Sequence, residues 1–139
     1  MVKMFVSETQ IRVRYAETDK MGFVYYGNYP QYYEVGRVEA MRKLGMSYRE
    51  MEEMGVMMPI ANMSIKYIQP AYYDDLITVR TIVKDMPVSR MNFSYEILNP
   101  EGKIINTGET TLAFINMKSR RPCAAPDFFV ERLKQYFQS

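Results

Sequence analysis

The spacing of apolar residues switches once along this chain, and that switch most narrows the folds open to it. Apolar or small residues recur every three or four positions between Asn28 and Gly45, which predicts one long helix that begins near Asn28 and ends at Gly45. The recurring residues are Tyr29, Tyr33, Gly36, Ala40 and Leu44. Beyond residue 60, apolar and polar residues alternate around residues 63–67, 77–83 and 91–97, which is typical of strands. A turn at Asn99–Gly102 joins the last of these to a strand over residues 103–116.

Shorter elements complete the pattern. Alternation over residues 10–16 predicts a first strand, and Ser47 with Glu50 forms a capping box for a short helix over residues 47–54. Residues 127–137 predict a C-terminal amphipathic helix. Val35 and Val38 lie off the apolar stripe of the long helix, so we expect that helix to be covered on more than one side. The order predicts an α+β fold in which an antiparallel sheet surrounds one helix.

Composition limits both size and chemistry. The 139 residues fit a single domain, residues 1–139. The chain contains no histidine, which excludes Ser-His-Asp and Cys-His catalysis and histidine-ligated zinc or haem. The net charge of +2 argues against a general nucleic-acid binder, and no metal site is expected.

The setting of the chain is also predicted by composition. A single cysteine, Cys123, cannot form an internal disulfide, which favours a reducing cytoplasm. No apolar run is long enough to cross a bilayer, and the first ten residues lack the apolar stretch and cleavage site of a signal peptide. We therefore expect a cytoplasmic protein with no transmembrane segment.

A polar loop before the long helix holds the candidate chemistry. Asp19 lies seven residues before Tyr26 and Gly27, directly upstream of the predicted helix start. Unpaired N–H groups in the first helical turn can hold a developing anion, while a nearby carboxylate attacks a carbonyl or deprotonates water. The alternative is an acidic surface loop in which Asp19 caps a neighbouring turn.

Two stretches resemble the hotdog-fold thioesterases of the 4-hydroxybenzoyl-CoA thioesterase family, which includes acyl-CoA thioesterases associated with the Tol-Pal system. In the first, Thr18-Asp19, Gly22, Tyr25 and Asn28-Tyr29 precede a helix with Glu34 and Arg37. The second covers residues 65–76. With strand order and length the resemblance covers nearly the whole chain. It implies a hotdog fold, an antiparallel sheet of about five strands wrapped around one long central helix.

The resemblance also implies roles for residues of the loop. Asp19 occupies the position of the catalytic carboxylate, as nucleophile or general base. Many relatives carry histidine where this chain has Tyr26, so the backbone N–H of Tyr26 or Gly27, rather than the phenol, is expected to polarise the substrate carbonyl. Asn28 either orients the thioester or caps the helix. Glu34 either orders the loop or forms a surface or interface salt bridge.

Substrates of such thioesterases carry phosphates, so cations are candidates for substrate binding. The candidates are Lys66, Arg90 and the cluster Lys118-Ser119-Arg120-Arg121, with solubilising surface charge as the alternative. The wall of an acyl pocket is expected among Phe23, Tyr25, Met57 and Met58, unless these residues are core.

The leading hypothesis is therefore a hydrolase that cleaves an acyl-CoA or acyl-carrier thioester to a carboxylic acid and a free thiol. It needs no cofactor, because coenzyme A is part of the substrate. The resemblance implies a homodimer with sheets joined edge to edge and the pocket between subunits, and often a homotetramer. One alternative is a hydratase or dehydratase, although those usually use an Asp/His pair. The other is a module that binds an acyl ligand or acyl-carrier protein without cleaving it.

Overall fold

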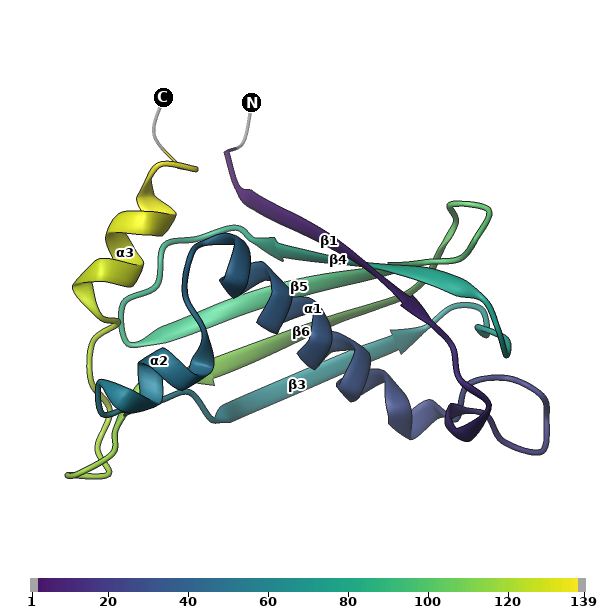
Figure 1. The fold of residues 1–139 in the computed structure, drawn as a ribbon, viewed down its shortest axis with the longest axis horizontal. Coiled ribbons are helices and arrows are strands. Elements are labelled where there is room, and N and C mark those ends of the chain that lie inside the picture. The colour runs from purple at the N-terminus through teal and green to yellow at the C-terminus, as the bar shows by residue number, and fades with distance from the viewer. Residues whose placement is uncertain (1–2, 138–139) are drawn as a thin grey trace.

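A five-stranded antiparallel sheet curves around one long helix, as the computed structural model shows for residues 3–137 (Figure 1). The strands lie in the order β1-β4-β5-β6-β3. Their bounds are β1 Phe5–Arg12, β3 Ile60–Tyr67, β4 Leu76–Val83, β5 Arg90–Leu98 and β6 Ile104–Ala113. The helix, α1 Tyr29–Lys43, lies across one face of the sheet. The predicted α+β architecture is confirmed.

The packing of α1 follows the predicted stripe. Tyr29, Tyr33, Gly36, Ala40 and Leu44 are all buried. At Gly36 a Cβ atom would lie 2.7 Å from Cγ1 of Val79, so only glycine lets the helix approach β4 this closely. Val35, on the opposite side, is 42% exposed. A single chain therefore leaves the outer side of α1 uncovered.

Smaller elements close one end of the barrel-like core. In α2, Tyr48–Glu53, half of the predicted capping box is present: the Glu50 N–H donates to Ser47 Oγ, but no bond from the Glu50 side chain back to the Ser47 N–H is formed. Strand β2, Val56–Met57, which was not predicted, pairs with β7, Ile115–Asn116. The last helix, α3 Asp127–Lys134, buries Phe129 and Leu133. Two short 3-10 helices, Tyr15–Glu17 and Tyr26–Asn28, flank the polar loop.

Three predicted boundaries were wrong. The first strand is Phe5–Arg12 rather than 10–16, because the chain leaves the sheet after Val13 and coils into a 3-10 turn that leaves Tyr15 78% exposed. The strand predicted over 103–116 divides into β6 and β7, which pair with different strands. Helix α3 ends at Lys134 rather than Phe137. The predicted hairpin turn is confirmed by hydrogen bonds between Asn99 and both Gly102 and Lys103.

Strand register defines two ends of the sheet. At the first, Tyr67 pairs with Asn106, and the polar loop of residues 13–28 lies beside them; we call this the loop end (Figure 1). At the other, Arg90 pairs with Ala113 and the turn of residues 116–121 follows; we call this the far end. Within residues 3–137 no helix is long and apolar enough to cross a membrane.

Candidate active site

Asp19 sits in a tight turn at the loop end. Its backbone N–H donates to the Phe23 carbonyl at 3.0 Å, and its Oδ1 accepts the Met21 N–H at 2.9 Å. The predicted alternative role, capping a neighbouring turn, is thus present. It occupies one carboxylate oxygen, and Oδ2 accepts no hydrogen bond from residues 3–137. The side chain is half-buried, so this second oxygen is available to a substrate or to water.

Two adjacent tyrosines follow the turn, and the first of them feels the charge of this carboxylate. The rings of Tyr25 and Tyr26 are 4.6 Å apart. The hydrogen bond between them raises the pKa of Tyr25 most, and the negative charge of Asp19 raises it further. The Tyr25 phenol therefore stays protonated at neutral pH and lies within electrostatic range of Asp19.

The start of the helix presents the backbone groups expected to act on a carbonyl. The 3-10 turn Tyr26–Asn28 runs directly into α1, so the N–H groups of Tyr26 and Gly27 have no acceptor within the helix. A Cβ atom at Gly27 would lie 2.6 Å from the Tyr25 ring. Glycine is therefore needed here because the Tyr25 ring covers its Cα.

Asn28 ties the loop to the helix. Its side chain makes no capping bond to α1, so that alternative was wrong. Its Nδ2 instead donates to the Glu17 carbonyl at 2.8 Å, across eleven residues. The same carbonyl accepts the Tyr25 N–H at 2.9 Å. Asn28 thus fixes the loop that carries Asp19 against the helix start.

Glu17 is the residue of this loop that sequence reasoning missed. It is 7% exposed, and its carboxylate accepts hydrogen bonds from Tyr32 Oη at 3.0 Å and from the Arg14 N–H at 2.9 Å. Burial alone would raise the pKa of Glu17, but these bonds and the Arg14 guanidinium together lower it. Glu17, and not Glu34, orders the loop: Glu34 is exposed and forms no ion pair with the residues that the structure describes.

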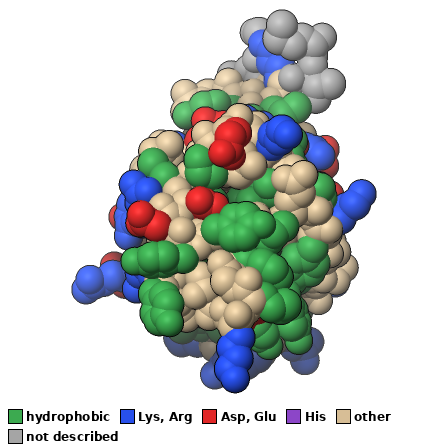
Figure 2. Space-filling model, turned by 90° about the vertical axis from the view of Figure 1, so that its right-hand side faces the viewer, with side chains coloured by type: hydrophobic (Ala, Val, Ile, Leu, Met, Phe, Trp, Pro, Cys, Tyr) green, Lys and Arg blue, Asp and Glu red, His purple; other side chains and the backbone are tan. Residues whose placement is uncertain are grey.

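An apolar pocket of about 340 Å³ opens beside the helix start. Its walls come from the loop, from α1 and from the end of β3, and they include Phe23, Tyr26, Tyr29, Tyr67, Ile68 and Pro70. Figure 2 shows apolar side chains gathered over this end of the molecule. Phe23 therefore lines a pocket near Asp19 as expected, whereas Tyr25 packs on Gly27 instead.

A second pocket, of about 390 Å³, lies at the far end and contains the two predicted methionines. Met57 and Met58 line it with Arg37 and Tyr48. Arg37 is 6% exposed; its Nε donates to Tyr48 Oη at 3.1 Å, while its Nη1 has no acceptor among residues 3–137. Burial raises the pKa of Tyr48 to about 12, against the opposing effect of Arg37.

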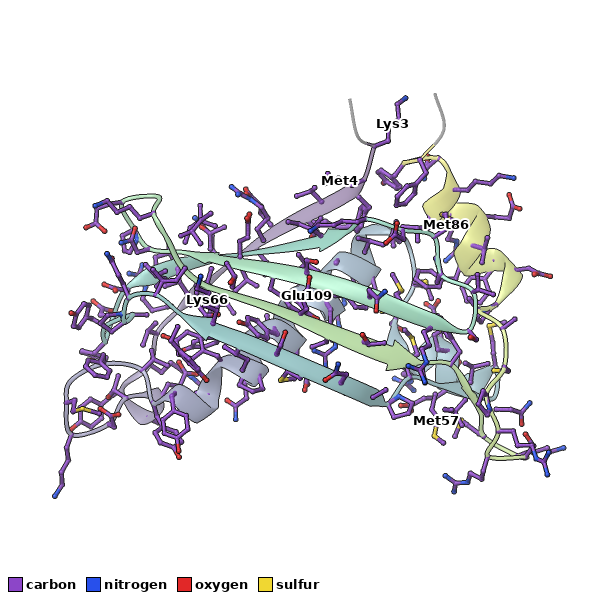
Figure 3. All side chains as sticks on the ribbon, turned by 180° about the vertical axis from the view of Figure 1, so that it is seen from behind. Lys3, Met4, Met57, Lys66, Met86 and Glu109 are labelled. Carbon is purple, nitrogen blue, oxygen red and sulfur yellow. The ribbon has the colours of Figure 1, made fainter. Side chains whose placement is uncertain are left out.

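The predicted phosphate-binding cations do not gather at Asp19 within one chain. Lys66 lies at the loop end of β3, on the sheet face that also carries Glu109 and is turned away from α1 (Figure 3). Arg90, Arg120 and Arg121 lie at the far end. Because β3 spans eight residues, the two ends are roughly 20 Å or more apart. No group of three or more metal-ligating side chains occurs in the described part of the chain.

Comparison with known proteins identifies the family. The model of the thioesterase-like superfamily matches residues 13–133. YneP of Bacillus subtilis (strain 168) is 36% identical over 119 residues, 86% of each chain. The acyl-CoA thioester hydrolase YbgC of Escherichia coli O6:H1 is 29% identical over 125 residues, 90% of this chain and 93% of YbgC. A DHNA-CoA thioesterase structure from Staphylococcus aureus superposes with a TM-score of 0.82 at 38% identity, covering 86% of this chain and 80% of that one. With its sheet wrapped around α1, the chain belongs to the thioesterase-like superfamily of hotdog-fold proteins.

Proposed function

We propose that this protein hydrolyses an acyl-CoA or acyl-carrier thioester to a carboxylic acid and a free thiol. The relatives named as acyl-CoA thioester hydrolase and DHNA-CoA thioesterase support this class of reaction. The observation that carries the proposal is the placement of Asp19, with one free carboxylate oxygen, in the loop that Asn28 and Glu17 fix against the start of α1.

In the proposed reaction, Asp19 attacks the thioester carbonyl or removes a proton from the attacking water. The negative charge that develops on the carbonyl oxygen is stabilised by the N–H of Tyr26 or Gly27 and by the partial positive charge of the helix start. The carbonyl then re-forms as the C–S bond breaks and the thiolate leaves, to be protonated to the free thiol. Where Asp19 is the nucleophile, this step leaves a mixed anhydride on Asp19, which water hydrolyses to the carboxylic acid and the free Asp19 carboxylate. Where Asp19 is the base, the attacking water supplies the oxygen and the acid forms directly. A thioester needs less activation than an amide, because sulfur donates poorly into the carbonyl, so the absence of histidine is chemically tolerable. No cofactor takes part.

We further propose that the active unit is a homodimer whose two chains are joined through β3. Two such dimers are proposed to form a homotetramer. Strand β3 lies at one edge of the sheet, and Ile60 and Tyr67 at its two ends are 42% and 50% exposed. Antiparallel pairing of two β3 strands about a twofold axis would set the far end of one copy beside the loop end of the other. Met57, Met58, Arg120 and Arg121 of the second copy would then complete the site around Asp19.

The remaining assignments follow from this function. In this proposal, Lys66 and the far-end arginines contact the phosphates of the substrate, and the single domain acts in the cytoplasm, where the unpaired Cys123 remains reduced. Asn28 contributes by holding the loop, and we assign it no direct contact with the thioester.

The test is thiol release from a panel of acyl-CoA substrates by wild-type protein and by Asp19→Asn. We expect the variant to stay folded and to lose turnover roughly a thousandfold. Asp85→Asn, an exposed acid between β4 and β5, is the matched control and should keep wild-type turnover. Undiminished turnover by Asp19→Asn would refute the role of Asp19. Binding of the panel without any thiol release would instead favour a module that holds acyl ligands without cleaving them.

A further inference from the structure

One buried cation of α1 has no carboxylate partner. Arg37 is 6% exposed, and none of its nitrogens lies within 4.0 Å of a carboxylate oxygen of residues 3–137. Its Nε donates to Tyr48 Oη at 3.1 Å, while its Nη1 has no acceptor among the same residues. Burial alone would lower the pKa of Arg37, but Tyr95 and Tyr48 together raise it, so the side chain keeps its charge. A buried charged donor without a partner is costly, so an oxygen that reaches Nη1 binds favourably.

This guanidinium belongs to the wall of the pocket of about 390 Å³ at the far end, where Met57 lies (Figure 3). Met57, Met58 and Pro59 make part of the wall apolar, and Glu34 and Glu52 add two acids. A volume of this size is typical of sites for small ligands. Nη1 itself is closed to water in the free chain, and the methionines, whose side chains are flexible, are the part of the wall that can open toward it.

The charges of this pocket favour a neutral oxygen over an anion. Glu34 and Glu52 line it and are both exposed, so two negative charges stand against the one positive charge of Arg37. A carboxylate would be repelled by both acids. A hydroxyl carries no charge, and its lone pairs accept a hydrogen bond from Nη1. A bond from a charged donor is stronger than one between neutral groups.

We propose that Arg37 is a specificity-determining residue, which binds a hydroxyl at the end of the acyl group farthest from the thioester. The inference rests on the proposed function and deepens it, because it names the acyl groups that the site prefers. In the proposed dimer the far end of one copy lies beside Asp19 of the other. An acyl group attacked by Asp19 therefore extends into the pocket that holds Arg37 of the other copy.

The free protein is prepared for this discrimination, because Nη1 is unpaired before a ligand arrives. An acyl group without a hydroxyl leaves it unpaired, whereas a hydroxyl gains a charge-assisted bond without first breaking another. A site that hydrogen-bonds a substrate hydroxyl discriminates more strongly than one that only senses an added methylene. The pocket thus combines an apolar wall for the body of the acyl group with one donor for its end.

The first experiment measures thiol release from two pairs of substrates, hexanoyl-CoA against 6-hydroxyhexanoyl-CoA and phenylacetyl-CoA against 4-hydroxyphenylacetyl-CoA. We expect wild type to favour the hydroxylated member of at least one pair roughly tenfold in kcat/KM, and Arg37→Met to bring that ratio to about one. The ratio does not depend on how much of a variant is folded, because both substrates meet the same protein.

Arg42→Met is the matched control and should keep the wild-type ratio. Arg42 is an exposed arginine of the same helix that pairs with Glu39. A wild-type ratio near one in both pairs would overturn the inference. A ratio that Arg37→Met leaves unchanged would overturn it equally, since the preference would then come from other groups.

A third substrate tests the choice of a neutral group. Adipoyl-CoA matches 6-hydroxyhexanoyl-CoA in length but ends in a carboxylate. We expect wild type to have a kcat/KM for it roughly tenfold lower, and Glu34→Gln/Glu52→Gln to narrow that gap. A wild-type preference for adipoyl-CoA would contradict the inference, because the pocket would then select anions.

Calorimetric titration of Asp19→Asn separates this inference from the proposed function. We expect the preferred hydroxylated acyl-CoA to have a Kd roughly tenfold below that of its plain counterpart, and the two Kd values to become equal in Asp19→Asn/Arg37→Met. Equal Kd values in Asp19→Asn itself would overturn the role of Arg37 alone. Rapid cleavage by Asp19→Asn would instead overturn the proposed role of Asp19, while the substrate ratios would still decide the role of Arg37.

Discussion

The two ends of the sheet are held together by different kinds of contact. At the loop end the bonds are long-range: Asn28 reaches Glu17 across eleven residues, Tyr32 reaches Glu17 across fifteen, and Tyr67 reaches Tyr26 across 41. The two bonds to Glu17 are partly or fully buried, so they form where water competes poorly, whereas the bond from Tyr67 is exposed. The conformation of the loop end therefore depends on the folding of the rest of the chain.

At the far end most bonds in the turn of residues 116–121 are local, although the Met117 N–H also donates to the Gly55 carbonyl at 2.9 Å. Asn116 Oδ1 accepts the N–H groups of Lys118 and Ser119 at 2.9 and 3.0 Å, and its carbonyl accepts the Arg120 N–H at 2.8 Å. These partners of Asn116 lie within four residues of it, and the cationic side chains point into solvent. The far end presents charge on a locally fixed turn.

This difference matches two functions, the placement of the reacting carboxylate at the loop end and the attraction of phosphate at the far end. A reacting carboxylate must be placed to within a fraction of an ångström, which long-range buried bonds achieve. Attraction of a phosphate tolerates looser geometry, because a surface charge acts over several ångströms. One chain keeps Asp19 and the far-end arginines at opposite ends, and only a second copy, as proposed, brings them together.

The sharpest way to break this comparison is to mix two inactive chains. Asp19→Asn lacks the carboxylate, and Arg120→Glu/Arg121→Glu reverses charge at the far end. If each site takes its loop from one copy and its cations from the other, refolding the two together yields mixed dimers with one intact site. We expect thiol release to rise from below 1% to about a quarter of wild type, since about half of the dimers would be mixed and half of their sites intact.

The control for mixing is each variant refolded with itself, which should regain nothing. Size-exclusion chromatography must show that mixed and single preparations share one oligomeric state. Recovery absent from a mixture that does contain mixed dimers would mean that each chain uses its own cations, and the separation of the two ends would then have no functional meaning.

A milder change at the far end sharpens the same comparison. Arg121→Gln removes one proposed phosphate contact, and we expect KM for acyl-CoA to rise roughly tenfold with kcat unchanged, as for the loss of a charge-assisted bond. The effect should vanish with an acyl-pantetheine substrate that lacks the nucleotide. Arg49→Gln is the control, an 88% exposed arginine side chain of α2 that pairs with Glu53. Equal KM changes in both variants would point to net charge alone.

Much of the fold was predictable because its determinants are local. The stripe on α1, the cap at Ser47 and the turn at Asn99–Gly102 each depend on residues a few positions apart. The first strand was misplaced because Ile11, Val13 and Tyr15 alternate as a strand would. What ends β1 is distant: Val13 bonds to Asp74 and Asp75, and the chain then turns away. No local pattern records that.

The candidate site divides in the same way. Tyr26, Gly27 and Asn28 are consecutive and Asp19 lies seven residues before Tyr26, so their place in one loop before the helix was predictable from the sequence. Glu17 was missed because an acid next to Arg14 reads as a surface pair, and its burial depends on Tyr32 of α1. The separation of Arg120 and Arg121 from Asp19 was equally hidden, since it follows from strand directions rather than from any motif.

The smallest expected effect concerns Glu17, which ties the loop end to α1. Its pKa is lowered from 4.5, so the folded state binds a proton at this group less readily than the unfolded chain does. The stability that Glu17 contributes is therefore fully present above pH 4.5 and is lost as the pH falls through the lower folded-state pKa. Glu17→Gln removes the charge, so we expect it to lower the free energy of unfolding by about 1–2 kcal/mol at pH 7.

Urea unfolding of wild type and Glu17→Gln at pH 7 and at pH 3.5 measures this contribution by difference, which cancels the carboxylates that both proteins share. The gap between the two proteins should narrow at pH 3.5, because wild-type Glu17 then begins to carry a proton as well. Glu101→Gln, an exposed acid in the β5–β6 turn, should show no gap at either pH. If the difference in the free energy of unfolding between wild type and Glu17→Gln were the same at both pH values, the charge of the Glu17 carboxylate would contribute nothing to stability. The loop end would then depend on packing, and the contrast with the locally held far end would lose its electrostatic part.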